Sequence, residues 1–67
     1  MIQLTINGQD CRFETAPTVT QVIAQLELAQ RRIAVERNGE IVPRSRFDET
    51  FLAAGDHLEI VVAVGGG

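Results

Sequence analysis

The stretch TVTQVIAQL, residues 18–26, interrupts a chain that elsewhere alternates between apolar and polar side chains. Its apolar residues recur at helical spacing, at Val19, Val22, Ile23 and Leu26. Thr18 followed by Gln21 is the pattern of a capping box, and Pro17 ends the strand that precedes it. The stretch therefore predicts one amphipathic helix of about three turns. Glu27 is expected on its polar face, and Arg31-Arg32 just past its C-terminus.

Upstream of this helix, the residues predict a β-hairpin. The first strand alternates with period two, with its apolar residues at Ile2, Leu4 and Ile6. Asn7-Gly8 favours a tight hairpin turn, which Gln9-Asp10 could lengthen. Cys11 and Phe13 continue the alternation in a second strand. The apolar side chains of both strands are expected on one face.

Downstream of the helix, further strands are indicated. Residues 33–37 lead into a second turn at Asn38-Gly39, and Ile41-Val42 then form a short strand that Pro43 limits. Residues 44–50 predict a loop with room for one helical turn, held to the core by Phe47, Phe51 and Leu52. After a turn at residues 54–56, the last strand covers residues 57–64. One of its faces carries Leu58, Ile60, Val62 and Val64, and the other His57, Glu59, Val61 and Ala63.

The order of hairpin, helix and further strands predicts an α+β fold, in which one helix packs on a mixed four- to five-stranded sheet. Placing the last strand beside the first, in parallel, connects these elements most simply. This arrangement is the β-grasp fold, which is also the fold of ubiquitin. We expect residues 1–64 to form a single β-grasp domain and residues 65–67 a flexible C-terminal glycine tail.

Composition narrows the classes of function. The 67 residues carry a net charge of −3 and no Trp or Tyr, which opposes both phosphate binding and base stacking, so nucleic acid is not expected as a partner. One Cys and one His cannot make a zinc site or an internal disulfide. No apolar run has the length of a membrane span, and the N-terminus alternates unlike a signal peptide, so we expect a cytoplasmic protein. No catalytic constellation is visible, so the chain is expected not to be an enzyme.

We expect the rest of the chain to serve as a support that presents its final residues, Gly65, Gly66 and Gly67. Without Cβ atoms, such a segment passes through a slot too narrow for any other residue. Three extended residues span about 10 Å, enough to carry a terminal carboxylate into another protein's active site. The strand-like residues before the glycines favour this function over that of a frayed terminus.

The chain resembles the ThiS family, the sulfur carriers of thiamine biosynthesis, over essentially its whole length. The resemblance depends on four features in order: the hairpin opening, the stretch VERNGEIVPR at residues 35–44, the Gly55-Asp56 turn and the glycine end. Members of that family usually end in two glycines, and some end in three.

The resemblance implies a carrier protein rather than a catalyst. It implies that an ATP-using, E1-like enzyme (ThiF-like) adenylates the α-carboxylate of Gly67, with Gly65 and Gly66 threading into that enzyme. The adenylate then takes sulfur from a donor such as a cysteine desulfurase and becomes a thiocarboxylate. Thiazole synthase (ThiG-like) receives the sulfur. No cofactor is expected to be bound by the chain itself, because the partner uses the ATP.

Four further residues are candidates for partner docking. Val61 and Ala63 are apolar, lie on the face opposite the core and lead directly into the tail. Arg44 and Arg46 flank Ser45 in an exposed loop, where they are either solubilising charges or contacts for an acidic patch on a partner. Cys11 is interpreted as a structural residue beside Phe13, and His57 as a solvated one.

Three other functions compete with a sulfur carrier for thiazole synthesis. A small-subunit-like carrier of molybdopterin synthase would share the fold and the tail, but that family tends to be longer and lacks the resemblance to NGEIVPR at residues 38–44. A ubiquitin-like modifier is the second alternative, although a chain without Lys cannot build lysine-linked chains on itself. The third is an interaction module in which the glycines have no chemical function.

Overall fold

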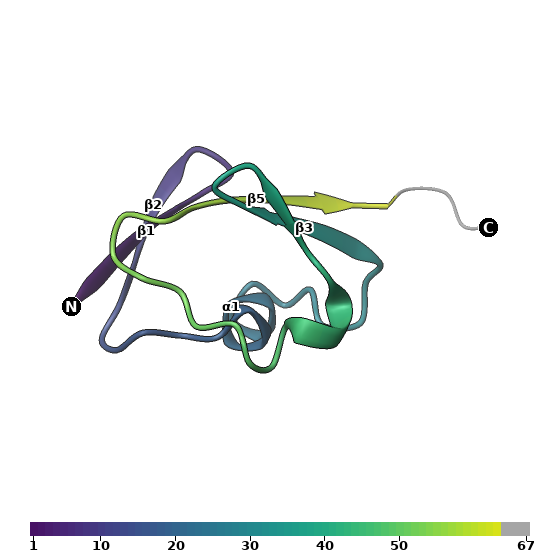
Figure 1. Ribbon diagram of the computed structural model, residues 1–67, viewed down its shortest axis with the longest axis horizontal. Helices are drawn as coiled ribbons and strands as arrows, with labels where there is room; N and C mark the ends of the chain where they lie inside the picture. The colour runs from purple at the N-terminus through teal and green to yellow at the C-terminus, as the bar shows by residue number, and fades with distance from the viewer. Residues whose placement is uncertain (64–67) are drawn as a thin grey trace.

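The computed structural model describes residues 1–63, which form a five-stranded sheet with one α-helix across one of its faces (Figure 1). In chain order the elements are β1 (Ile2–Ile6), β2 (Gln9–Phe13), α1 (Val19–Gln25), β3 (Ile33–Arg37), β4 (Glu40–Val42), the 3-10 turn η1 (Arg44–Arg46) and β5 (His57–Val62). The strand order is β2-β1-β5-β3-β4, with β1 and β5 parallel and the other neighbours antiparallel. The predicted mixed sheet with a single helix is confirmed.

Both hairpins close through two-residue Asn-Gly turns. Asn7 and Gly8 have φ angles of 51° and 82°, and Asn38 and Gly39 have φ angles of 50° and 88°. Positive φ at both central residues defines the type I′ turn, whose twist matches that of the flanking strands. Gln9 therefore pairs directly with Ile6, and the first loop is not lengthened.

The start of α1 agrees with the predicted capping box. The backbone N–H of Gln21 donates to Thr18 Oγ1 at 3.2 Å, and the side chain of Gln21 accepts from the N–H of Thr18 at 2.9 Å. The length of the helix was predicted wrongly, because α1 has 7 residues and thus about two turns rather than three.

The helix ends early because Glu27 adopts a left-handed conformation, with a φ of 61°. Its N–H donates to the Ala24 carbonyl at 3.1 Å, and the N–H of Leu28 donates to the Ile23 carbonyl at 3.0 Å. These two bonds form a Schellman motif, which normally has glycine in the position of Glu27. Leu26 consequently caps the helix, 39% exposed, and is not a core residue.

Two other sequence predictions change with this helix end. Glu27 does not lie on the polar face of a helix, and Arg31 and Arg32 follow the end of α1 by six and seven residues, outside its last turn, which contains no basic residue. Leu28 instead turns back and packs, half-buried, against the core.

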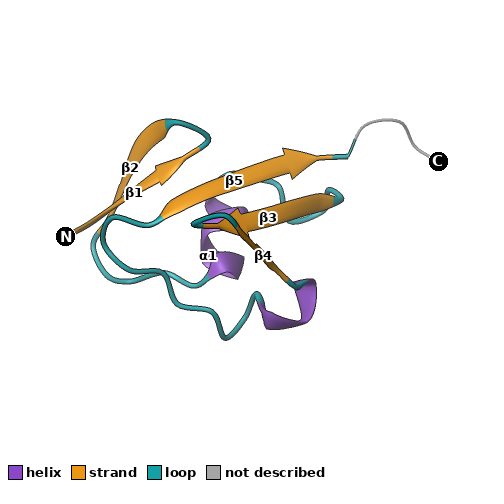
Figure 2. Cartoon of the chain, turned by 45° about the horizontal axis from the view of Figure 1, so that its top comes forward, coloured by secondary structure: helices purple, strands orange, loops and turns teal. Residues whose placement is uncertain are grey.

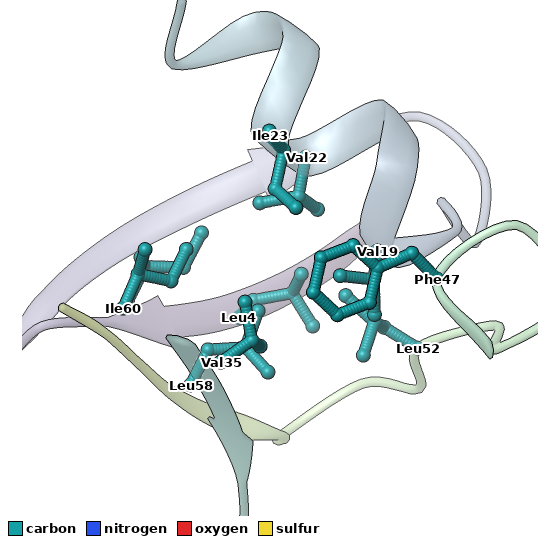
Figure 3. Packing of buried hydrophobic residues seen from close by; sticks show 10 residues of the cluster. Leu4, Val19, Val22, Ile23, Val35, Phe47, Leu52, Leu58 and Ile60 are labelled. Carbon is teal, nitrogen blue, oxygen red and sulfur yellow. The ribbon is translucent and has the colours of Figure 1, made fainter. Parts of the chain in front are cut away.

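The core fills the space between α1 and the sheet (Figure 3). It consists of ten buried side chains: Leu4, Ile6, Val19, Val22, Ile23, Val35, Phe47, Leu52, Leu58 and Ile60. Phe47 and Leu52 hold the long loop to this core as predicted, but Phe51 is 62% exposed and does not. Consecutive residues of an extended segment point in opposite directions, so the burial of Leu52 directs Phe51 outward.

The faces of β5 follow the predicted alternation. Leu58 and Ile60 are buried and Val62 is half-buried, whereas Glu59 and Val61 are exposed. The strand ends at Val62, before the predicted end at residue 64, and Val64 lies outside the described residues. The proposed domain boundary after residue 64 lies there as well.

Candidate functional site

The candidate site is the end of the chain, and what the structure describes is the platform from which it extends. Gly65, Gly66 and Gly67 lie outside the described residues, so their predicted threading and sulfur-carrying roles stay predictions. Ala63 is the last residue described. Its N–H donates to the Arg32 carbonyl at 2.9 Å, which continues the pairing of β5 with the segment before β3.

The strand that leads to the tail is the central strand of the sheet (Figure 2). Five pairs, from Ile33↔Val62 to Arg37↔Leu58, join β5 to β3. On its other side β5 pairs with β1 over only two positions, Thr5↔His57 and Ile6↔Leu58. The strand is thus held on both sides near its start, whereas the described residues closest to the glycines, Val62 and Ala63, are paired on the β3 side alone.

The side chain of Asn7 extends the short pairing between β1 and β5. Its Oδ1 accepts from the Ile60 N–H at 2.7 Å, and its Nδ2 donates to the Ile60 carbonyl at 3.1 Å. The amide thus takes the place of a backbone neighbour beside β5. The sequence predicted only a turn at Asn7. Nothing in the residues around Asn7 indicates that its side chain contacts a residue 53 positions away.

The start of β5 is held from the other side by Asn38, the asparagine of the second hairpin turn. Its Oδ1 accepts from the His57 N–H at 2.9 Å, and its Nδ2 donates to the Asp56 carboxylate at 3.0 Å. Arg37 forms a salt bridge with the same carboxylate at 2.8 Å. Both Asn-Gly turns therefore hold the strand that carries the tail.

The buried Asp56 carboxylate is the electrostatic centre of this second contact. Burial raises its pKa, but the N–H of Ala53, the amide of Asn38 and the guanidinium of Arg37 outweigh burial and hold the pKa below its ordinary value. The carboxylate is therefore charged at neutral pH, and it fixes the turn before β5.

The face of the sheet opposite α1 carries three exposed apolar side chains, two at the tail end of β5 and β3 and one farther from the tail on β4, and no described element covers this face (Figure 1). Val61 is 61% exposed and pairs with the exposed Ala34, and Ile41 on β4 is 64% exposed. We call Ala34, Ile41 and Val61 the open-face patch. The predicted exposure of Val61 and Ala63 is confirmed, whereas Ala34 and Ile41 were not identified from the sequence. The strands that carry Ala34 and Ile41 are too short for the alternation of apolar and polar side chains to show which of their faces is covered.

Arg44 and Arg46 are exposed, as predicted, but they lie on different surfaces of the molecule. Arg44 lines a groove beside α1, together with Arg31. Arg46 lines a different hollow, beside Ile41 and Pro43. The structure thus separates two residues that the sequence suggested as one docking contact.

Neither Cys11 nor His57 belongs to a reactive arrangement among residues 1–63. Cys11 lies opposite Leu4 on the inner face and packs against the core, half-buried because β2 is an edge strand. His57 is exposed, as predicted. The described residues contain no cluster of three or more metal-ligating side chains. No helix among them is long and apolar enough to span a membrane.

Comparison with known proteins identifies the family. The model of the ThiS family matches residues 4–67. The sulfur carrier protein ThiS of Bacillus subtilis is 37% identical over 65 residues, which cover 96% of this chain and 98% of that protein. A thiazole synthase of Paramagnetospirillum magneticum is 42% identical over 66 residues, but this chain, matched over 98% of its length, spans only 20% of that longer protein.

A solved structure agrees with the fold over the same range. The crystal structure of a thiamine biosynthesis protein (ThiS) from Geobacter metallireducens superimposes with a TM-score of 0.81 at 36% identity, covering 98% of this chain and all of that one. The predicted β-grasp fold is therefore confirmed. The matches in sequence and in structure both show that the chain belongs to the ThiS family, the sulfur carrier proteins of thiamine biosynthesis.

Proposed function

We propose that the α-carboxylate of Gly67 carries the sulfur that becomes part of the thiazole ring of thiamine. The observation that carries the proposal is the match of the family model through residue 67, which includes the three glycines after β5. The firm attachment of β5 supports it, because a rigid strand followed by residues without side chains can deliver a terminal group to a partner's active site.

The proposed chemistry activates the carboxylate and then replaces an oxygen by sulfur. A carboxylate oxygen of Gly67 attacks the α-phosphorus of ATP in an E1-like enzyme, and pyrophosphate leaves. The outer sulfur of a persulfide, supplied by a donor such as a cysteine desulfurase, then attacks the acyl carbon, and AMP leaves. A second thiol attacks the S–S bond of the acyl disulfide so formed, becomes joined to the donor cysteine in a disulfide and releases the thiocarboxylate. A carboxylate is a poor acyl donor to sulfur until adenylation provides AMP as the leaving group.

Thiazole synthase is the proposed recipient of the sulfur. Segments similar to this chain form about a fifth of the thiazole synthases of P. magneticum and Magnetococcus marinus. A carrier segment and a synthase joined in one polypeptide support a working contact between the two. The open-face patch is the proposed docking surface for the adenylating enzyme, since it is apolar and exposed and includes Val61, two residues before Ala63.

The threading step is tested with Gly66→Val. A β-branched side chain adds bulk and restricts the backbone, so ATP–pyrophosphate exchange with the adenylating enzyme should be abolished while the thermal midpoint stays unchanged. Full exchange activity in this variant would refute threading. Deletion of Gly67 is a milder change, because the chain would still end in two glycines.

The docking surface is tested with Val61→Glu. Because Val61 is exposed, the variant should fold normally and bind the adenylating enzyme about tenfold more weakly, the equivalent of about 1.4 kcal/mol. His57→Glu is the matched control, on the same strand and face but at the end far from the tail. Equal affinities for both variants would contradict the assignment of this surface.

The product itself is detected in protein recovered from cells that synthesise thiamine. Intact mass should show a fraction in which one C-terminal oxygen is exchanged for sulfur. Oxidation of Met1 or Cys11 changes the mass by nearly the same amount, so fragmentation must place the change on Gly67.

A further inference from the structure

A second surface feature lies on the helix side of the sheet. It is a groove of about 260 Å³ between the end of α1, the segment that follows it, and η1. Its floor is apolar and is formed by Ile23, Leu28, Ile33 and Phe47. The volume is below the range of sites for drug-sized molecules, and it suits one or two amino-acid side chains.

The rim of this groove is positively charged at one end. Arg31 and Arg44 both line it, and Arg44 Nη2 donates to the Arg31 carbonyl at 3.5 Å, which places the Arg44 guanidinium against the segment before β3. Among residues 1–63 the one salt bridge is Arg37–Asp56, so neither rim arginine belongs to an ion pair there. The two rim arginines therefore give this end of the groove a positive charge, although the net charge of the chain is −3.

The negative charge of the groove lies at its opposite end. Asp48 also lines it, but its carboxylate accepts a hydrogen bond from the Thr20 hydroxyl in the first turn of α1. The arginine end is formed by Arg31, in the segment after α1, and by Arg44 of η1, whose guanidinium contacts that segment. The groove is therefore polarised along α1, with an apolar floor between its two ends.

The arginine end is close to the start of the tail. Ile33, on the floor of the groove, pairs with Val62, and the carbonyl of Arg32 accepts from the N–H of Ala63. The groove and the open-face patch thus lie on opposite faces of the sheet at the same end. A protein that takes in the glycines can contact both.

We propose that this groove binds an acidic segment of the enzyme that adenylates Gly67, and the proposal rests on the function proposed above. An aliphatic or aromatic side chain of that segment would occupy the apolar floor, and a neighbouring Asp or Glu would pair with Arg31 and Arg44. Arginine suits this role because its planar guanidinium binds carboxylates through paired hydrogen bonds. The apolar floor and the overall negative charge of the chain disfavour nucleic acid as the occupant.

The test uses charge reversal with a matched control. Arg31→Glu and Arg44→Glu should each weaken binding to the purified adenylating enzyme about tenfold. Both should also reduce the dependence of Kd on salt concentration, because a long-range attraction has been removed. Arg12→Glu makes the same charge change at an exposed position on the edge strand β2, away from both the groove and the open-face patch, and should bind like the wild type. Thermal melts monitored by circular dichroism establish that all three variants fold.

Binding is measured without ATP, so that it is independent of the chemistry. If Arg31→Glu and Arg44→Glu bind like Arg12→Glu, the groove proposal is wrong even where adenylation proceeds normally. If they weaken binding to thiazole synthase alone, the occupant has been assigned wrongly. A wild-type chain that binds the adenylating enzyme but supports no ATP–pyrophosphate exchange would refute the proposed function instead, and the variants would still report on the groove.

Discussion

The side-chain contact between Asn7 and Ile60 can be isolated by two substitutions at one position. Asn7→Gly removes both hydrogen bonds to Ile60 but keeps a residue that tolerates the φ of 51° in the turn. Asn7→Ala removes the same bonds and adds a Cβ that is unfavourable in this conformation. The difference between the two variants therefore separates the contact with β5 from the geometry of the turn.

The magnitudes follow from the contacts. Two partly buried hydrogen bonds contribute about 1 kcal/mol each, so Asn7→Gly should lower the free energy of unfolding by about 2 kcal/mol. The left-handed conformation adds about 1 kcal/mol for Ala, giving about 3 kcal/mol for Asn7→Ala. A domain of this size has a total stability of roughly 3–10 kcal/mol, so the Ala variant is expected to be partly unfolded at moderate temperature.

Urea denaturation followed by far-UV circular dichroism is the appropriate assay, because the chain contains neither Trp nor Tyr for fluorescence. Hydrogen exchange of the Ile60 amide gives a local measurement, and in Asn7→Gly it should be accelerated by more than the loss of global stability accounts for. If the stability of Asn7→Gly differs from the wild type by less than about 0.5 kcal/mol, the contact does not hold β5 and the reasoning is wrong.

Three further predictions concern the core, the helix end and pH. Val22→Asp should unfold the domain, because Val22 is fully buried between α1 and the sheet and an aspartate there would be unpaired; a native-like circular dichroism spectrum would contradict this packing. Glu27→Gly should raise the unfolding free energy by about 1 kcal/mol, by relieving the left-handed glutamate of the Schellman motif; an unchanged urea midpoint would show that there is no such cost. The Asp56 carboxylate should contribute its full stabilisation above pH 3.8, the ordinary pKa of the group. The stabilisation should be lost as the pH falls from 3.8 through the lower pKa of the folded state, because the unfolded chain binds the proton more tightly. Asp56→Asn should be less stable than the wild type at neutral pH, with a gap that narrows below pH 3.8; a constant gap would contradict the lowered pKa.

The fold could be predicted from the sequence because its signals are local. Alternation in residues 2–6, the capping box of Thr18 and Gln21, and the two Asn-Gly turns each specify an element within a few residues. The parallel pairing of β1 with β5 then follows from connecting those elements. The end of α1 was not predictable in this way, because Glu27 is an ordinary helix residue and takes its left-handed conformation only where Leu28 turns back to the core.

The candidate site was predictable only in part for the same physical reason. The glycines and the exposed Val61 follow from the sequence near the tail, but the open-face patch also needs Ala34 and Ile41 from other strands. The groove combines the end of α1 with η1, which only the packing of the loop brings together. Arg31 and Arg44 are 13 residues apart, and nothing in their local patterns indicates that they share a rim.

The position of β5 has a consequence for how the protein is made. It is the last of the five strands to leave the ribosome, yet it lies between β1 and β3. Before residues up to Val62 have been synthesised, the nascent chain holds two separate hairpins, and an isolated hairpin is at best marginally stable. Folding of this domain is therefore expected to wait until β5 has left the ribosome. A product of interrupted translation that lacks β5 would stay unfolded, open to proteolysis and unable to compete with intact carrier for the partner enzymes.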